Sequence, residues 1–298
     1  MKLSTSSNIV FDRPEGPFFH MDRMMRYAKE AGFDTLDISF YDWALPGSPF
    51  LTDEWKQWID RVAEEKECLG MRFGQSHAYT YNFLSPALTP EERMRHEELT
   101  LRSIECCYIL GSRLCVTHPD TVYDSPRPMA VSEEKNAEYF QRLLEKTARF
   151  DMSFAVENMC DITIAPKRKF GAYPEELVNL AKRVGDSRFG ICWDFEHGDI
   201  MQQNQRDALR LIGSYLYATH VSDTHSATDP DLMHVLPLMG TVDWKEAVQT
   251  LREIGYEGYF SFEVNNYGRY FPECLLPEAL RLMYHVGEYL LSQTISDI

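Results

Sequence analysis

The chain has 298 residues, of which 44% are hydrophobic, enough to form a sizeable core. Its formal net charge is −16. A surface this acidic repels the phosphates of nucleic acid and the anionic face of a membrane, so we expect neither as a partner. Small sugars, polyols or keto acids fit better as ligands, provided that a metal or local positive charge handles any anion.

The cysteines and the first residues bear on the cellular compartment. Seven cysteines form no CxxC pair, which is typical of reduced thiols in a cytoplasmic protein. Residues 1–7 contain no apolar stretch of signal-peptide length, and no run of about 18 apolar residues occurs in the chain. We therefore expect a cytoplasmic protein.

Short apolar runs alternate with longer amphipathic stretches along the chain. The apolar runs predict eight strands, over residues 2–10, 34–40, 71–77, 113–118, 152–158, 188–194, 215–222 and 258–264. The amphipathic stretches predict eight helices, over residues 20–31, 52–69, 90–110, 132–149, 173–184, 203–213, 243–254 and 275–293. Eight such units predict a (β/α)₈ TIM barrel that occupies residues 1–298 as one domain. A doubly wound open sheet is the main alternative, but no glycine-rich loop follows the first strand.

Helix boundaries carry their own signals. Thr89 followed by Pro90 and Glu92 predicts a capping box at the start of one helix. Ser132 before two glutamates predicts another helix start. Glycines a few residues before a strand, such as Gly32 and Gly185, predict helix C-caps.

Four consecutive predicted strands end in side chains that can bind a metal. They are Glu157, Asp194, His220 and Glu263. Each alone could be a structural residue, but in a barrel the C-terminal ends of the strands point into one mouth. Equivalent positions in four neighbouring units therefore predict convergence on one divalent metal ion. Three carboxylates and one imidazole suit Mn²⁺ first, with Mg²⁺ or Zn²⁺ as alternatives.

Other polar and aromatic residues fall in the same predicted mouth. We expect substrate contacts from His197 and Asn158, and from His77 and His118, for which structural hydrogen bonding is equally open. Aromatic residues after the second and third strands could stack on a sugar or form a contact in a homo-oligomer: Tyr41, Trp43, Tyr79, Tyr81 and Phe83. A basic cluster that could meet a phosphate, although a solvated loop is the preferred interpretation, comprises Lys167, Arg168 and Lys169.

The motifs around these residues resemble the xylose-isomerase-like barrel superfamily of sugar isomerases and epimerases, which also contains endonuclease IV. The resemblance covers nearly the whole chain and is strongest from 150 to 265. The motifs that carry it are Val156-Glu157-Asn158, Cys192-Trp193-Asp194-Phe195-Glu196-His197, Thr219-His220-Val221-Ser222-Asp223, the stretch from His234 through Gly240-Thr241-Val242-Asp243-Trp244, and Gly255-Tyr256-Glu257-Gly258-Tyr259-Phe260-Ser261-Phe262-Glu263.

The resemblance implies that Glu157, Asp194, His220 and Glu263 hold one divalent ion. It further implies that the two glutamates act as acid and base on opposite faces of a small polyhydroxy carbonyl substrate, a sugar or a sugar phosphate, while His197 contacts a substrate hydroxyl. A metal that stabilises an enediolate and a carboxylate that removes the α-proton are together sufficient for isomerisation or epimerisation. The related ketose 3-epimerases carry an arginine shortly after the strand-seven histidine, whereas residues 223–227 contain none.

Three other functions remain open at this point. A dehydratase or lyase acting on an inosose-type cyclic polyol would use the same enolate chemistry. A phosphodiesterase like endonuclease IV would use His77, His118 and His197 in a three-metal cluster, but Asp231 and His234 are one residue too far apart for its motif, and the chain is acidic. A non-enzymatic sugar-binding barrel would be expected to lack one of the ligands.

Overall fold

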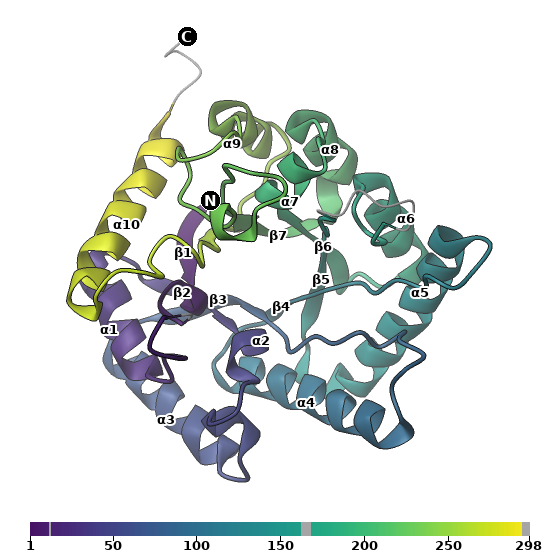
Figure 1. The fold of residues 1–298 in the computed structure, drawn as a ribbon, viewed down its shortest axis with the longest axis horizontal. Coiled ribbons are helices and arrows are strands. Elements are labelled where there is room, and N and C mark those ends of the chain that lie inside the picture. The colour runs from purple at the N-terminus through teal and green to yellow at the C-terminus, as the bar shows by residue number, and fades with distance from the viewer. Residues whose placement is uncertain (12, 162–167, 294–298) are drawn as a thin grey trace.

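Eight parallel strands close into a barrel in chain order (Figure 1). The computed structural model describes residues 1–11, 13–161 and 168–293. The strands are β1 (Lys2–Ser6), β2 (Thr35–Ser39), β3 (Arg72–His77), β4 (Leu114–Thr117), β5 (Ser153–Glu157), β6 (Phe189–Asp194), β7 (Leu216–Val221) and β8 (Tyr259–Phe262). Pairing of Leu3 with Phe260 joins the first strand to the last, so the predicted (β/α)₈ barrel is confirmed.

The longer helices surround the barrel on its outside, and the two short helices that directly follow β2 and β6 lie at its mouth (Figure 1). The helices are α1 (Met21–Ala31), α2 (Phe40–Trp43), α3 (Trp55–Cys68), α4 (Pro90–Ile109), α5 (Pro128–Lys146), α6 (Pro174–Val184), α7 (Phe195–Ile200), α8 (Gln205–Ile212), α9 (Trp244–Glu253) and α10 (Leu276–Ser292). None of the described helices is long and apolar enough to cross a bilayer.

Several helix boundaries agree with the local sequence signals. Thr89 and Glu92 form the predicted capping box at the start of α4. Gly32 ends α1 with φ of 115° and Gly185 ends α6 with φ of 69°, left-handed values that glycine adopts without steric cost. These signals predict the helix ends correctly because each depends only on residues within one turn of the helix end.

Other boundaries differ from the prediction. Helix α5 begins at Pro128, and Ser132 lies inside it, where its hydroxyl accepts a hydrogen bond from the Val122 amide at 2.8 Å. The serine therefore ties down the preceding loop instead of capping the helix. The short helices α2 and α7 follow their strands directly, and the sequence pattern did not predict them.

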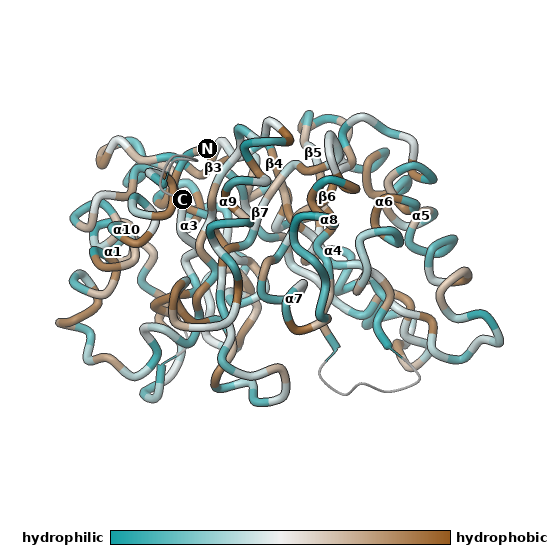
Figure 2. The backbone as a smooth tube through the Cα atoms, turned by 90° about the horizontal axis from the view of Figure 1, so that it is seen from above, coloured by the Kyte–Doolittle hydropathy of each residue, from teal (hydrophilic) through white to brown (hydrophobic). Residues whose placement is uncertain are grey.

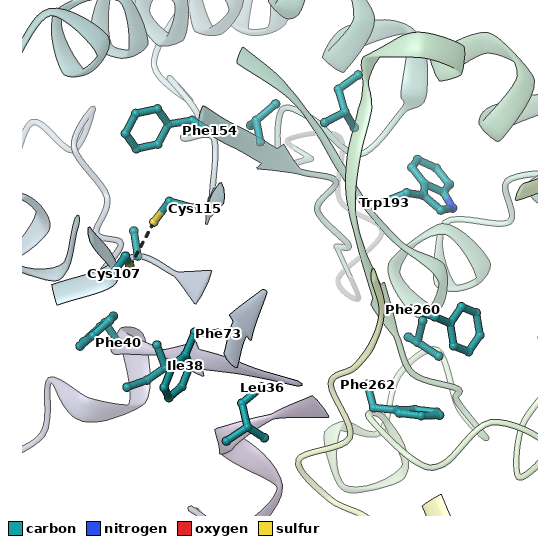
Figure 3. Close-up of a cluster of buried hydrophobic side chains, with 14 of the residues drawn as sticks. Leu36, Ile38, Phe40, Phe73, Cys107, Cys115, Phe154, Trp193, Phe260 and Phe262 are labelled. Atoms are coloured by element: carbon teal, nitrogen blue, oxygen red, sulfur yellow. Dashed lines mark hydrogen bonds between the residues drawn. The ribbon is translucent and has the colours of Figure 1, made fainter. Parts of the chain in front are cut away.

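Apolar strand residues pack outward against the helices. Figure 3 shows Phe154, Trp193 and Phe260 pointing away from the ring of strands. Cys107 of α4 and Cys115 of β4 meet in the same layer, with their Sγ atoms 3.7 Å apart. Burial of this layer fixes each strand against its helix, and so holds the strand ends at the mouth in register.

The barrel interior contains a smaller apolar cluster made of Val116, Ala155, Cys192 and Ala218. Seen from the side, long loops and α7 lie beyond one end of the barrel (Figure 2). Helix α7 directly follows the end of β6, so this end is the C-terminal mouth of the barrel. The strand-end residues that the sequence analysis selected all lie there.

Candidate metal centre and active site

The four predicted ligands converge. Glu157, Asp194 and His220 lie on β5, β6 and β7, and Glu263 directly follows β8. One donor atom from each lies within 4.8 Å of the donor atoms of the others. The Glu263 amide continues the sheet by donating to the Val221 carbonyl at 3.0 Å, so this glutamate is placed as rigidly as a strand residue.

His220 stands between the two glutamates. Its Nδ1 is 3.1 Å from Glu157 Oε2 and 2.8 Å from Glu263 Oε2. Its Nε2 faces Asp37 Oδ2 at 3.5 Å, and that oxygen also accepts a hydrogen bond from Gln75 Nε2 at 2.8 Å. A buried carboxylate behind a histidine fixes the orientation of the ring, so Asp37 aims Nδ1 at the cluster.

The unpartnered atoms of this cluster fit a bound cation. Asp194 is fully buried, and its Oδ2 has no hydrogen-bond partner in the described part of the chain. Glu157 Oε2 and His220 Nδ1 are also buried there without a well-oriented hydrogen bond. Buried polar atoms are nearly always satisfied, and three oxygen donors with one imidazole match the preferences of Mn²⁺ or Mg²⁺.

The surroundings set the charges of the three carboxyl groups. Burial raises the pKa of Glu157, but the nearby imidazoles of His220, His118 and His77 lower it by more. The resulting pKa lies well below the usual range of a glutamate. Burial also raises the pKa of Glu263, but the His220 imidazole outweighs this effect. The pKa of Glu263 is lowered to about 2. At Asp194 burial prevails and raises the pKa to about 6. Both glutamates are therefore ionised at neutral pH and can accept a proton.

His77 and His118 lie beside Glu157 at the mouth. Their Nε2 atoms are 2.9 Å apart, and they lie 3.4 and 3.3 Å from Glu157 Oε2. The Ala78 carbonyl, 2.9 Å from His77 Nδ1, can only accept, so the proton of His77 sits on Nδ1. Both rings line the cavity described below; their contact with substrate stays a prediction.

The other two predicted substrate-binding residues differ in position. His197 lines the cavity, and its Nδ1 donates to the Asn158 carbonyl at 2.8 Å. Asn158 is fully buried, and its amide exchanges hydrogen bonds of 2.6 and 2.9 Å with the Asp194 backbone. Asn158 is not among the cavity-lining residues, so its geometry favours a positioning role that joins β5 to β6, instead of the expected substrate contact.

A cavity of about 460 Å³ reaches the cluster, and Glu157 and Glu263 are the two predicted ligands in its lining. It is acidic, and the carboxyl groups in its lining are Asp42, Asp120, Glu157 and Glu263. Among the described residues, Lys169 is the only lysine or arginine in that lining. Four histidines, His77, His118, His197 and His234, also line the cavity, so these rings contribute to its charge together with the carboxylates.

Besides the predicted ligands and substrate-binding residues, Asn8, Cys160 and His234 also line the cavity. The Asn8 amide donates to Glu263 Oε1 at 3.2 Å. His234 lies in the loop after β7, where its backbone amide donates to Glu196 Oε2 at 2.7 Å. Cys160 lies beside His197, which lowers the thiol pKa against the opposing effect of burial. No periodicity marks these positions, because irregular loop backbone places them.

Four of the five aromatic residues of the predicted mouth divide into two groups, and the fifth, Tyr79, lies outside the cavity lining with its hydroxyl 2.7 Å from His96 Nδ1. Tyr41 and Tyr81 line the cavity. Trp43 and Phe83 are buried, and they pack on Trp58 and Tyr139 with ring centroids 4.7 and 3.7 Å apart. The second group serves the core and cannot stack on a sugar.

One residue of the predicted basic cluster forms an ion pair with the protein itself. Arg168 forms an ion pair with Glu176 at 2.6 Å, which directs its charge away from the cavity. Lys169 lines the cavity. Lys167 lies outside the described residues.

Comparison with known proteins agrees with this architecture. A sequence profile described as xylose isomerase-like TIM barrel matches residues 25–286. The chain belongs to this family.

Individual relatives are more distant. The uncharacterized protein y4fM of Sinorhizobium fredii is 25% identical over 174 residues, which is 58% of this chain and 53% of that protein. The chain thus spans about half the length of that relative. A D-psicose 3-epimerase of Enterocloster bolteae is 30% identical over 84 residues, 28% of this chain and 25% of the epimerase. The crystal structure of a D-tagatose 3-epimerase-like protein superposes with a TM-score of 0.74 at 19% identity, covering 98% of this chain and 97% of the other, which shows the shared fold.

Proposed function

We propose that this protein is a divalent-metal-dependent isomerase or epimerase of a small polyhydroxy carbonyl compound. The observation that carries the proposal is the convergence of four donor groups within 4.8 Å beside a cavity that two of them, Glu157 and Glu263, line. The D-psicose 3-epimerase and the D-tagatose 3-epimerase-like protein support this choice of reaction.

Glu157, Asp194, His220 and Glu263 would hold the ion, with Mn²⁺ as first choice and Mg²⁺ or Zn²⁺ as alternatives. When bound, the ion would polarise the substrate carbonyl and stabilise the negative charge of the enediolate. The rim histidines His77, His118 and His197 orient substrate hydroxyls around it. The Asn158 carbonyl holds the His197 ring in place for that contact.

The two glutamates move the proton. Glu157, as carboxylate, removes the proton from the carbon next to the carbonyl, and the C–H electron pair becomes the enediolate double bond. Glu263, which also contacts His220 Nδ1, takes up a proton from solvent during the cycle and delivers it to the opposite face of the same carbon, while Glu157 releases its proton to solvent. The product is the epimer, and the reverse reaction exchanges the two roles. Return of the proton to the neighbouring carbon gives isomerisation instead.

Metal analysis followed by deuterium wash-in tests this function. The purified protein should contain one divalent ion per chain. In D₂O it should place deuterium on the carbon next to the carbonyl across a panel of ketoses, without net loss of water. Loss of water from an inosose would select a dehydratase. A fully metal-loaded protein that exchanges no substrate proton in any ketose would contradict the proposal.

One observation favours a second candidate, phosphodiester hydrolysis. His77, His118 and Glu157 form a further group with donor atoms within 4.8 Å of one another, which suits a second ion. The scarcity of cationic side chains around the cavity weighs against a nucleic-acid substrate. Two or more ions per chain together with cleavage of abasic DNA would select this candidate.

A further inference from the structure

A second cavity of about 390 Å³ adjoins the first. It lies between the loop that follows β3 and the loop that follows β4. Asn82, Asp120, Thr121 and Tyr123 line both cavities. One continuous cleft therefore runs from the candidate metal centre outward across the rim of the barrel.

Hydrogen bonds tie the two loops together, so this part of the cleft is preformed. Asp120 Oδ2 accepts from the Leu84 amide at 2.6 Å, and Asp120 Oδ1 accepts from the Thr121 amide at 2.7 Å. The Asp120 backbone amide in turn donates a hydrogen bond to Asn136 Oδ1 of α5 at 2.9 Å. Arg93 of α4 donates to the carbonyl of Ser85 at 3.2 Å. Both walls thus rest on helices.

The first cavity alone has room for a small ligand. Ligand sites typically measure roughly 300–1,000 Å³, and this cavity already falls within that range. A single sugar ring at the metal centre leaves the second cavity unfilled. The cleft as a whole suits a longer molecule.

The lining of the second cavity indicates the chemistry of what fills it. Leu84, Pro86 and Val122 are apolar, and Tyr123, which is 39% exposed, lines the cavity with them. Hydroxyl, amide and carboxylate groups alternate with them. A sugar ring has an apolar C–H face and a hydroxylated edge, and such a mixed lining complements both.

The charged residues of the second cavity limit the kinds of ligand that fit there. The described lining of the second cavity contains Asp120 and Asp124 but no lysine, arginine or histidine. A phosphate or carboxylate group placed there would meet the like charge of these two carboxylates. A neutral occupant therefore fits this lining better than an anionic one.

We propose that the physiological substrate is a neutral glycoside, with its carbonyl-bearing sugar at the metal centre and a second sugar ring in the cavity beside Tyr123. This inference rests on the proposed function and specifies its substrate class. It excludes phosphorylated sugars, and it assigns Val122 and Tyr123 to substrate selection.

Deuterium exchange on matched substrates tests the inference. Fructose, fructose 6-phosphate, and the glucosyl- and galactosyl-fructoses isomaltulose and lactulose offer the same keto group with different extensions. The Mn²⁺-loaded protein should show a kcat/KM at least tenfold higher for one of the disaccharides than for fructose, and the lowest value for the phosphate.

A blocking variant locates the effect. Val122 lines only the second cavity, so Val122→Trp should reduce the ratio of kcat/KM for the disaccharide to that for fructose at least tenfold. Leu211→Trp, which adds bulk at an exposed position on α8, should leave this ratio unchanged. Ser85→Phe fills the same cavity from the other loop, and thermal unfolding of each variant verifies that it is folded.

The outcomes separate the two proposals. Absence of exchange with every substrate overturns the proposed function. Exchange that is equal for fructose and both disaccharides, or a disaccharide preference that survives both blocking variants, overturns the glycoside inference alone.

Discussion

Asp194 divides its two carboxylate oxygens between the protein and the candidate metal centre. Oδ1 accepts the His197 amide at 2.8 Å and caps α7, while Oδ2 is buried without a partner in the described structure. A single residue therefore ends a strand, starts a helix and presents one bare donor atom. The sequence revealed the residue but not the helix, because a cap that is also a strand end leaves no loop residues to mark the boundary.

Asp37→Asn tests the orientation of His220. The asparagine can keep the hydrogen bond from Gln75, but it no longer presents a charged acceptor to His220 Nε2. Loss of such a partner typically weakens metal binding about 10- to 100-fold, and titration calorimetry with Mn²⁺ measures it. Asp34→Asn, at an exposed aspartate, should bind as the unmodified protein does. Equal affinity in both variants would show that Asp37 does not position the ring.

Glu157→Gln tests the proton carrier. The amide oxygen retains one neutral donor for the ion but cannot take a proton, so exchange at the α-carbon should fall by about 10²–10⁴-fold while metal largely remains bound. Deuterium incorporation followed by NMR gives the rate, and metal analysis gives the occupancy. Glu257→Gln, at an exposed glutamate near β8, is the control. Full exchange by Glu157→Gln would remove this glutamate from the mechanism.

At the scale of elements, the long loop between β7 and α9 is organised by one buried carboxylate. Asp223 accepts hydrogen bonds from the backbone amides of Leu238 and Val242, both at 3.1 Å, and from Trp244 Nε1 at 2.8 Å. Gly240 passes so close that a Cβ there would lie 2.2 Å from Asp223 Oδ1. This loop carries His234 into the cavity, so its internal bonds shape the site.

Gly240→Ala should therefore disturb both stability and function. Overpacking of this kind typically costs about 1–3 kcal/mol in the free energy of unfolding, which urea denaturation measures. Deuterium exchange should fall as well, because the displaced loop carries His234. Gly255→Ala has open space around the new Cβ but a φ of 74°, so it should lose about 1–2 kcal/mol and retain full exchange. Wild-type stability and exchange in Gly240→Ala would refute this account of the loop.

Regular elements were predictable, and the irregular ones were not. Short apolar runs predict the strands that carry Glu157 and Asp194. The barrel fold then predicts that the C-terminal ends of these strands lie at one mouth. His234 and Asp120 depend on loop conformations set by hydrogen bonds between distant segments, such as that of Asp120 with Leu84. The start of α5 was missed for the same reason, since the partner of Ser132 is a loop amide.

For the whole molecule, metal binding and folding should be linked. Closing the barrel brings three carboxyl groups together in a buried space, which disfavours the folded state until a cation compensates them. Mn²⁺ at a free concentration 100 times its Kd should stabilise the protein by about 2.7 kcal/mol, seen as a higher Tm in calorimetry. A chelator should reverse the shift.

A variant in which Asp194→Asn and Glu263→Gln are combined provides the control. It removes two charged donors, and its Tm should be insensitive to Mn²⁺. A Tm that rises equally in this variant and in the unmodified protein would place the ion elsewhere.

The acidic lining of the first cavity has a kinetic consequence. A chain with a formal net charge of −16 enriches divalent cations in the surrounding solvent layer and depletes anionic metabolites. Asp42 and Asp120 continue that field inward from the rim. Ion capture should therefore be fast in dilute buffer and slow as salt shortens the reach of the field. The rate at which the protein takes up a scarce metal ion then depends on the acidic residues of the whole molecule, and not only on the residues that bind the ion.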